Sequence, residues 1–199
     1  MRILVLGRSG QVASALFGRL ALAGHDVLSF SREKLDLGDV DAARAGVLAA
    51  RPDIVINAAA YTAVYQAESN ADAAYALTAI APAAAAAAAA ELRAPFIHFS
   101  TDYVFDGSKG QPYLEADETS PLGVYGQTKL AGETAVAAAN PRHVILRTSW
   151  VCSARGKNFL RTMLRLAGER DELGVVDDQI GRPTFAPDLA DAVAAIIDR

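Results

Sequence analysis

Cysteine is almost absent from this sequence: Cys152 is the single one, so no disulfide bond can form within the chain. A chain without disulfides is typical of a reducing compartment. Long hydrophobic runs are missing near the N-terminus, where the first apolar run, Ile3–Leu6, ends at Gly7. Such a run is too short for a signal peptide or a membrane span. We therefore expect a cytoplasmic protein that does not associate with a membrane.

Clusters of positive charge are also missing. The chain has 19 Lys and Arg against 23 Asp and Glu, a formal net charge of −4. No basic run is long enough to follow a nucleic-acid backbone, so we expect no nucleic-acid partner. A phosphate-bearing ligand is not excluded, because backbone N–H groups at a helix N-terminus can hold phosphate without side-chain charge. The sequence shows no cluster of metal-ligating residues either, and we expect no metal site.

The chain does contain a regular alternation of short apolar and longer amphipathic segments, and its 199 residues suit one domain. Strands are expected where short runs are rich in Val, Ile and Phe: 3–6, 26–30, 54–56, 96–100 and 143–146. Helices are expected between them, over 11–23, 40–50, 70–92 and 124–139. This order predicts an α/β fold, a Rossmann-type doubly wound parallel sheet with its ligand crevice at the carboxyl ends of the strands.

The pattern is looser after Arg147. A helix is expected over 158–167, a short strand over 173–176 and a final helix over 187–197. The Ala-rich run 83–90 is of low complexity, but Ala is the best helix former, so a helix packed on the sheet is expected there. No linker-like stretch separates the tail, so residues 1–199 are treated as one domain.

A glycine turn follows the first expected strand. Gly7, Gly10 and Ala13 have the spacing G-x-x-G-x-x-A and stand between that strand and a helix. Gly7 permits a tight turn, Gly10 lets the backbone approach a pyrophosphate, and Ala13 lets helix and strand pack closely. Two glycines can also simply shape a βα turn. The place of the motif after the first strand favours binding of a dinucleotide.

The end of the second expected strand bears on the choice of dinucleotide. A carboxylate there usually binds the ribose 2′-OH of NAD, whereas an arginine suits the 2′-phosphate of NADP. Arg32 lies at this place, and Asp36 lies a few residues further on, where adenine is expected. A lone arginine can equally be a solvated loop residue. We expect NADPH as the cofactor, with NADH possible.

Polar segments follow the third and fourth expected strands, at 57–62 and 100–103. Tyr125 and Lys129 then share one face of a helix, because they are four residues apart. Since an ammonium favours the phenolate, Lys129 is expected to lower the pKa of Tyr125. The tyrosine would exchange a proton with a substrate oxygen, oriented by Thr101, while a hydride moves to or from nicotinamide. Such a pair can also be an ordinary contact on an exposed helix face.

Several longer motifs resemble one known family. They are GRSGQVA, RPDIVINAAAYTAV, AES, FSTDYVFDG, PLGVYGQTKLAGE, LRTSWV, NFLRTMLRLA and DQIGRPTFAPDLAD. Together they cover most of the chain, in order, and resemble the dTDP-4-dehydrorhamnose reductases, which are extended short-chain dehydrogenase/reductases. The resemblance implies reduction of the 4-keto group of dTDP-4-dehydro-L-rhamnose by NAD(P)H. The product, dTDP-L-rhamnose, serves the synthesis of cell-surface polysaccharide.

The resemblance also implies roles for single residues. Tyr125 would be the proton donor, Lys129 would hold the nicotinamide ribose, and Thr101 would orient the substrate. Besides Gly7 and Arg32, the expected cofactor contacts are Gly10, Gln11, Val12, Asp36, Leu37, Ala60, Tyr61, Thr62, Tyr125 and Lys129. The expected sugar contacts are Thr101, Asp102, Tyr125 and Trp150. A tryptophan at position 150 can also be part of a core.

Three features depart from the family pattern. Tyr65 stands where relatives usually have an aspartate at the edge of the pocket. Thr78 stands where the alanine helix usually carries an asparagine that supports the active-site lysine through water, so Lys129 is expected to be less well oriented. The sequence ends at Arg199, whereas relatives continue with a smaller substrate-binding lobe. Residues from about 150 to 199 are therefore expected to be the start of a truncated substrate-binding region.

Two other functions stay open. A non-catalytic NAD(P)-binding module, regulatory or dependent on a partner chain, is favoured by Tyr65, Thr78 and the missing lobe. The intact Thr101, Tyr125 and Lys129 oppose it, although the resemblance includes such a case, the reductase-like regulatory subunit of methionine adenosyltransferase. Another nucleotide-sugar enzyme, such as an epimerase, is opposed by the motifs STDYVFDG and DQIGRPT. The oligomeric state, a homodimer or a complex with a partner chain, is also open.

Overall fold

A computed structural model describes residues 1–30 and 35–199, and within them a five-stranded parallel sheet forms the centre. Its strands are β1 (Arg2–Leu6), β2 (Asp26–Phe30), β3 (Ile54–Asn57), β4 (Phe96–Thr101) and β5 (His143–Thr148). Their order across the sheet is β2-β1-β3-β4-β5, and every neighbouring pair is parallel. The predicted doubly wound parallel sheet is confirmed. From β1 the chain adds β2 on one side and then β3, β4 and β5 on the other, so the strand order reverses at β1. A ligand crevice is expected at this point, between the carboxyl ends of β1 and β3.

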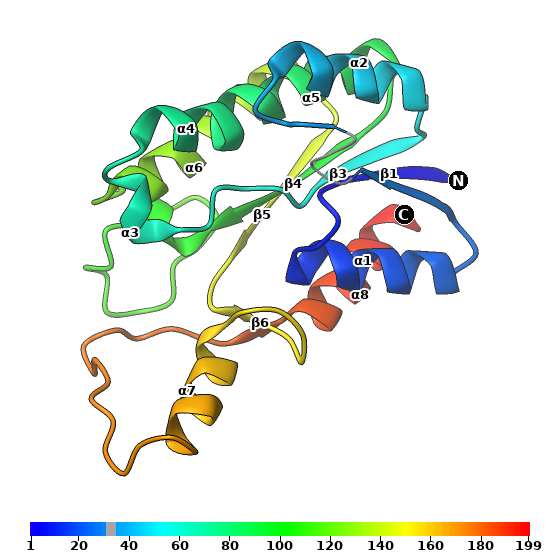
Figure 1. The fold of residues 1–199 in the computed structure, drawn as a ribbon. Helices are drawn as coiled ribbons and strands as arrows, with labels where there is room; N and C mark the ends of the chain where they lie inside the picture. Colours follow the sequence, from blue (N-terminus) through cyan, green and yellow to red (C-terminus); the bar gives the residue numbers. More distant parts are fainter. Residues whose placement is uncertain (31–34) are drawn as a thin grey trace.

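Helices cover both faces of this sheet (Figure 1). On one face, α1 (Gln11–Leu22) packs against α8 (Ala186–Ile197). On the other face lie α2 (Val40–Ala50), α5 (Ala81–Glu91) and α6 (Val124–Ala139), packed side by side. The first helix and the last therefore share a layer although they stand at opposite ends of the sequence, and the helix expected over 187–197 closes the fold.

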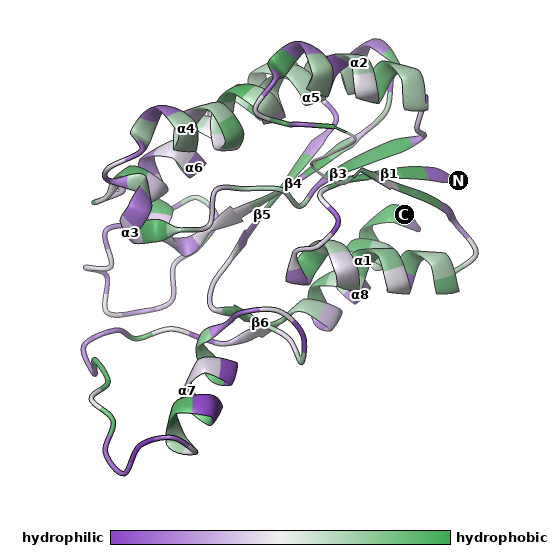
Figure 2. Ribbon diagram, viewed as in Figure 1, coloured by the Kyte–Doolittle hydropathy of each residue, from purple (hydrophilic) through white to green (hydrophobic). Residues whose placement is uncertain are grey.

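Each face of the sheet has its own hydrophobic core. Along β1, Leu4 and Leu6 face the layer of α2 and α5, whereas Ile3 and Val5 face the layer of α1 and α8. All four side chains are buried, and Figure 2 shows β1 and β3 coloured as hydrophobic over most of their length. Because strands buried on both faces need apolar side chains at successive positions, these strands lack the polar–apolar alternation of a half-exposed sheet.

The helix expected over 70–92 is built in three parts: α4 (Ala71–Tyr75), the π-helical turn η1 (Ala76–Ile80) and α5. In the part of the chain that the structure describes, Ala71–Glu91 is the helical run long and apolar enough to cross a membrane by composition. Half of that run is buried inside the fold, against α2 and α6. Its alanines thus serve close helix packing here.

The remaining elements are short, and most lie near the carboxyl edge of the sheet: α3 (Val64–Ala67), the 3₁₀ turn η2 (Asp102–Val104), β6 (Val151–Cys152), α7 (Phe159–Ala167) and β7 (Thr184–Phe185). The strand expected over 173–176 is wrong. Val175 and Val176 are exposed and pair with no strand, so apolar character alone misled the prediction. The pair β6 and β7, two residues each, was too short to find from periodicity.

Close approach of the backbone places α6 against its neighbours. A Cβ atom at Gly132 would lie 2.4 Å from the carbonyl oxygen of Thr78 in η1. A Cβ atom at Gly126 would lie 2.2 Å from the carbonyl oxygen of Tyr103 in η2. Both distances are shorter than real Cβ contacts allow, so only glycine lets α6 pack this tightly.

We therefore expect Gly132→Ala to lower the free energy of unfolding by about 2 kcal/mol, because overpacking forces η1 and α6 apart. Gly18→Ala in α1 is the matched control, since a Cβ atom there meets nothing within 4 Å. That control should raise stability by about 0.5–1 kcal/mol through the better helix propensity of alanine. Urea denaturation of both variants measures the difference. Equal effects of the two substitutions would contradict the packing described for α6.

Candidate active site

The glycine turn after β1 lies at the expected crevice. Gly7 has φ +101°, a backbone region that residues with a side chain rarely adopt. A Cβ atom at Gly7 would lie 3.4–3.5 Å from the backbone of Ala58 and Ala59, which follow β3. The turn after β1 and the loop after β3 are therefore in contact, at the point where doubly wound sheets bind ligands.

The first turn of α1 is open to a ligand. Gly10 precedes the helix, and among the described residues no side chain caps the N–H groups there. A Cβ atom at Gly10 would meet nothing within 4 Å, so space remains in front of Gln11 and Val12. Uncapped N–H groups at a helix N-terminus bind phosphate. The residues present thus fit the pyrophosphate of a dinucleotide.

The other expected cofactor residues lie in two loops, one after β3 and one after β2. Ala60, Tyr61 and Thr62 lie in the loop after β3, where the Tyr61 N–H group donates a hydrogen bond to Thr78 Oγ1 at 3.3 Å. Asp36 and Leu37 lie between β2 and α2, further from the glycine turn along the sheet edge. Arg32, predicted to meet a 2′-phosphate, lies outside the described residues.

Thr101 and Tyr125 meet at the end of β4. Thr101 is the last residue of that strand, and its side chain is hydrogen-bonded to the side chain of Tyr125 at the start of α6. Thr101 Oγ1 also donates to Asp102 Oδ1 at 3.0 Å and accepts from the Tyr103 N–H group at 3.2 Å. The Tyr103 ring meets the Tyr125 ring edge to face, with centroids 5.6 Å apart. The structure thus brings together the two residues that the sequence placed on separate elements.

Lys129 lies one helical turn beyond Tyr125 and is only 2% exposed. Its Nζ atom donates a hydrogen bond of 2.5 Å to the carbonyl oxygen of Phe99 in β4. Burial lowers the pKa of Lys129 to about 8, while the carboxylate of Glu133 acts in the opposite direction. Lys129 therefore remains an ammonium below about pH 8.

The expectation that Lys129 lowers the pKa of Tyr125 is wrong for this structure. Burial raises the pKa of Tyr125, and Asp102 and Tyr103 raise it further, whereas the hydrogen bond from Thr101 lowers it. Lys129 is not among these causes, and its ammonium is hydrogen-bonded to the Phe99 carbonyl on β4. Tyr125 is consequently a neutral phenol at neutral pH, which suits a proton donor.

The buried Glu133 and the partly buried Arg147 form an ion pair behind Lys129 that was missed in the sequence. Glu133 is on α6, one turn beyond Lys129, and Arg147 is on β5. The guanidinium donates two hydrogen bonds, from Nε to Oε1 at 2.9 Å and from an Nη atom to Oε2 at 2.7 Å. The spacing Lys129–Glu133 was visible in the motif KLAGE, but the distant arginine was not.

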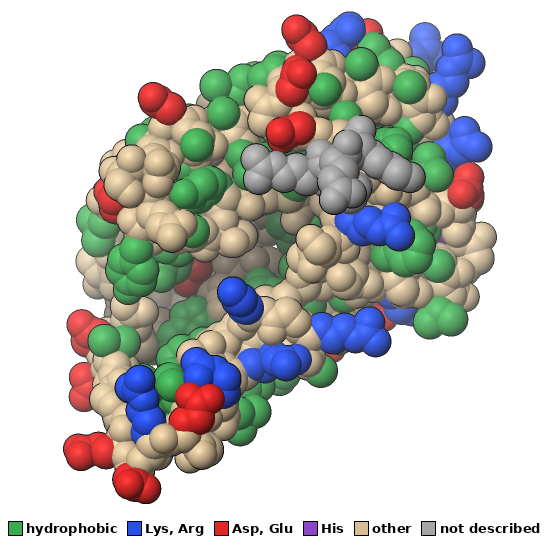
Figure 3. Space-filling view, viewed as in Figure 1, with side chains coloured by type: hydrophobic (Ala, Val, Ile, Leu, Met, Phe, Trp, Pro, Cys, Tyr) green, Lys and Arg blue, Asp and Glu red, His purple; other side chains and the backbone are tan. Residues whose placement is uncertain are grey.

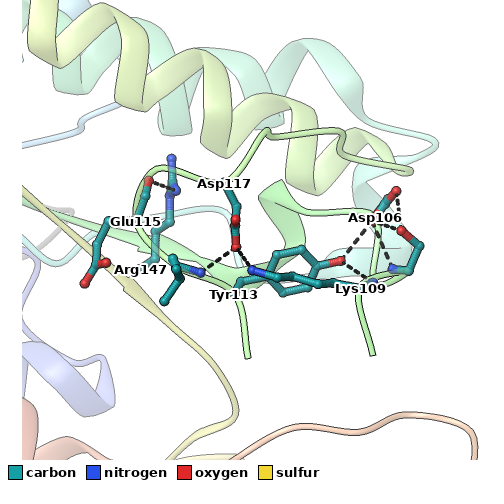
Figure 4. Close-up of polar contacts among 8 residues, drawn as sticks. Asp106, Lys109, Tyr113, Glu115, Asp117 and Arg147 are labelled. Atoms are coloured by element: carbon teal, nitrogen blue, oxygen red, sulfur yellow. Dashed lines mark hydrogen bonds and ion pairs between the residues drawn. The ribbon is translucent and has the colours of Figure 1, made fainter. Parts of the chain in front are cut away.

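The loop after η2 extends this ion pair toward the surface (Figure 4). Arg147 donates to the carbonyl oxygen of Glu115 at 3.3 Å. In the same loop Tyr113 donates to Asp106 Oδ1 at 2.9 Å, and Lys109 pairs with Asp117. Figure 4 shows these side chains lying in one row beside α6, so the loop is tied to the helix that carries Tyr125 and Lys129.

A second buried pair, Asn57 and His98, lies one layer below the crevice. Asn57 Nδ2 is 3.0 Å from His98 Nδ1, and the two residues are register partners on β3 and β4. Burial, and then the charge of Lys129, lower the pKa of His98 to about 3. His98 is therefore neutral, and it supports the strand ends without adding charge.

Thr78 does not contact Lys129 in the way expected of the family asparagine. Its side chain is buried in η1, and its hydroxyl accepts the hydrogen bond from Tyr61 described above. Lys129 is oriented instead by the Phe99 carbonyl. Tyr65, the other departure, is 89% exposed, so its phenol lies on the surface next to the crevice loop.

Trp150 is not a core residue. It is 42% exposed and has φ +47°, which is rare for a bulky side chain. A Cβ atom at Gly181, in the DQIGRPT motif, would lie 2.8 Å from the indole, so this loop passes directly against the ring. Strained backbone of this kind is concentrated at functional sites.

The surface beyond Trp150 is hollowed on the side of β6 and α7. A groove of about 740 Å³ is lined there by Ser153, Leu160, Leu164, Phe185 and neighbouring residues. Figure 3 shows Lys and Arg side chains over the region of β6 and α7, below the central hollow of the molecule. Thr101, Tyr125 and Lys129 are not part of this groove, so it is a separate feature. Among residues 1–30 and 35–199, no three His, Cys, Asp or Glu side chains are grouped to hold a metal ion.

Comparisons with known proteins show the family to which the chain belongs. The family model described as the RmlD substrate binding domain matches residues 1–199. The dTDP-4-dehydrorhamnose reductase of Sinorhizobium fredii is 50% identical over 199 residues, which are 100% of this chain and 67% of that protein. This chain belongs to the dTDP-4-dehydrorhamnose reductase family.

Solved structures of the family have the same fold. A family member from Clostridium acetobutylicum is 42% identical with a TM-score of 0.96, covering 100% of this chain and 70% of its own. The reductase of Bacillus anthracis, solved in complex with NADP, is 38% identical with a TM-score of 0.95, covering 99% and 70%. The chain thus spans about two thirds of the length of the curated family members it matches, 67% and 65% for two of them.

The buried Lys129 leads to a pH-dependent stability. Below about pH 8 the folded and unfolded chains both carry the ammonium, so the cost of burying it is fully present. The unfolded chain keeps this proton up to about pH 10.5 whereas the folded chain loses it near pH 8, so stability rises with pH in that window. Relative to Lys129→Met, the wild type should gain about 3 kcal/mol across it. Urea denaturation of both proteins at several pH values tests this, and a difference independent of pH would contradict the buried cation.

Proposed function

We propose that this chain reduces the 4-keto group of dTDP-4-dehydro-L-rhamnose to the alcohol of dTDP-L-rhamnose with NADPH. The observation that carries the proposal is the meeting of Thr101 and Tyr125 at the carboxyl end of β4, with Lys129 one turn behind. The open glycine turn lies at the same edge of the sheet. Family members of known name, in Sinorhizobium fredii among others, are dTDP-4-dehydrorhamnose reductases, which supports the choice of substrate.

The residues at the edge of β1 and β3 would hold the dinucleotide. The uncapped first turn of α1, at Gly10, Gln11 and Val12, would bind the pyrophosphate. Residues 60–62 would line the nicotinamide side, and Lys129 would bind the nicotinamide ribose. NADPH, when bound, supplies the hydride. The NADP complex of the Bacillus anthracis reductase supports this cofactor, and the role of Arg32 at the 2′-phosphate stays a prediction.

Tyr125 would supply the proton of the reaction. The hydride adds to the carbonyl carbon, the electron pair of the C=O bond moves to oxygen, and the Tyr125 hydroxyl protonates that oxygen. Because its pKa is raised, Tyr125 is fully protonated at neutral pH and ready for this direction. The hydrogen bond between Thr101 and Tyr125 lowers the pKa of the phenol against the effect of burial, and solvent restores the proton after its transfer.

The sugar nucleotide would lie between this edge and Trp150. Thr101, Asp102 and Trp150 are the proposed sugar contacts, and the strained backbone of Trp150 against Gly181 supports that role. We further propose that residues from about 150 onward begin a substrate-binding region. In support, β6 and β7 form a sheet of their own, apart from the central one. Binding energy from the nucleotide, remote from the reacting carbon, would be used there to position the keto group.

A second candidate is a cofactor-binding module that does not turn over substrate by itself. None of the residues of α7, all of them described, is buried, and Phe159, Leu160 and Leu164 are exposed. A helix with an uncovered apolar face is incomplete as a substrate-binding wall. On this reading the chain binds NADPH but needs a partner, or a second copy of itself, to act on the sugar. A cytoplasmic location accords with the single cysteine and stays a prediction.

The experiment is oxidation of NADPH by this chain in the presence of dTDP-4-dehydro-L-rhamnose. Tyr125→Phe should lower the rate by about 10²–10⁴-fold, because the proton donor is lost while the ring is kept. Tyr113→Phe is the control. It also removes one phenolic hydroxyl, but this hydroxyl is bonded to Asp106 in the loop after η2. Its rate should stay close to that of the wild type.

Equal rates for the wild type and Tyr125→Phe would show that the assignment of Tyr125 is wrong. No oxidation by the wild type, together with saturable binding of NADPH, would favour the second candidate. Neither oxidation nor binding would overturn both.

A further inference from the structure

The side chain of Gln11 does not face the glycine turn but reaches across to the segment between β6 and α7. Its Nε2 atom donates to the carbonyl oxygens of Val151 at 3.3 Å and Lys157 at 3.4 Å. Its Oε1 atom accepts from Asn158 Nδ2 at 2.8 Å. The partners are 140 to 147 residues away in the sequence, so the first residue of α1 is tied to the region that begins at β6.

Asn158 completes the connection on the other side. Its Oδ1 atom accepts from the Arg161 N–H group at 2.9 Å and so caps α7. Its Nδ2 atom donates both to Gln11 Oε1 and to the Ser153 carbonyl oxygen at 2.9 Å. Asn158 therefore holds the N-terminus of α7 and the N-terminus of α1 with one amide group.

The local chain is shaped for this contact. Gly156 has φ +76°, and a Cβ atom there would lie 3.1 Å from Gln11 Cγ, so only glycine lets the loop wrap closely around the glutamine. Ser153 Oγ lies 3.1 Å from Gln11 Oε1 and 2.6 Å from the Arg155 carbonyl oxygen. Its single proton can serve only one of these, so the bonds to Asn158 and the two carbonyls are the constant part of the contact.

We propose that Gln11 is a positioning residue that couples the dinucleotide turn to the β6–α7 segment, residues 151–158. The backbone N–H groups at the start of α1 are left for the pyrophosphate, while the side chain of the same residue holds the segment that leads from Trp150 to α7. A ligand that orders the first turn of α1 therefore also orders residues 151–158. The coupling rests on the proposed function for its ligand, NADPH.

Two consequences follow from this coupling. Without ligand, the hydrogen bonds of Gln11 should slow the opening of residues 151–158. With NADPH, opening should become slower still. If the closed segment favours binding of NADPH, then bound NADPH must favour the closed segment by the same free energy. Segments with few buried side chains, such as α7, are those in which local opening is measurable.

Hydrogen exchange of the backbone amides, followed by mass spectrometry, tests both consequences in this chain without any turnover. Gln11→Leu removes the bonds and adds no charge near the pyrophosphate. Asn158→Asp keeps a good helix cap but loses the Nδ2 donor, so it breaks the contact from the side of α7. Each variant should speed exchange over residues 151–158 by about tenfold and abolish the added protection by NADPH. Ser14→Ala is the control, since its hydroxyl bonds to the Arg8 carbonyl within the turn.

Unchanged exchange of residues 151–158 in both variants would overturn the proposal, as would equal acceleration in Ser14→Ala. Faster exchange in the variants, with NADPH bound to the wild type but giving no added protection, would overturn the coupling and leave only a structural contact. Failure of NADPH to bind the wild type would overturn the proposed cofactor site and the coupling together, and exchange without ligand would still decide whether Gln11 holds the segment.

Discussion

The ammonium group of Lys129 lies in the interior at the ends of the strands, and much of the site is arranged around it. An unpaired charge at 2% exposure is costly, so the Phe99 carbonyl accepts its hydrogen bond and the carboxylate of Glu133 lies one turn away. Glu133 is itself buried, and Arg147 neutralises it with two hydrogen bonds. The polar contacts thus run from Lys129 and Glu133 on α6 to Arg147 on β5, and from Arg147 to the loop shown in Figure 4.

The same arrangement separates the roles of Tyr125 and Lys129. The ammonium of Lys129 is hydrogen-bonded to a carbonyl of β4, whereas the pKa of Tyr125 is raised, mainly by burial. Thr101 is the group that hydrogen-bonds the tyrosine directly. Glycines at positions 126 and 132 allow α6 to lie close enough to η1 and η2 for these contacts to form. The close packing of α6 against η1 and η2 therefore sets the positions of Tyr125 and Lys129 at the crevice.

The fold was predictable because its signals are local. The central strands and the helices that flank them were found within one or two residues, since doubly buried strands and amphipathic helices have different periods. The run 173–176 misled because its valines are apolar yet exposed. That Thr101 and Tyr125 would lie together was also predictable, because the carboxyl ends of parallel strands share one edge, and their catalytic roles stay a prediction.

What the sequence did not reveal depends on contacts between distant residues. The pKa of Tyr125 is raised mainly because its side chain is buried, which no spacing shows. The partners of Gln11 lie at least 140 residues away, and Glu133 pairs with Arg147 on another element. The strained backbone of Trp150 likewise becomes visible only with the Gly181 loop in place.

The central claim is that the edge formed by β1, β3 and β4 is a site for a nicotinamide dinucleotide and a keto-sugar nucleotide together. Calorimetric titration of NADPH and NADH into this chain, with and without the sugar nucleotide, tests it most directly. The account predicts saturable binding of one NADPH per chain, tighter than that of NADH, and an affinity that changes when the sugar nucleotide is present. Absence of saturable binding of either dinucleotide would contradict it.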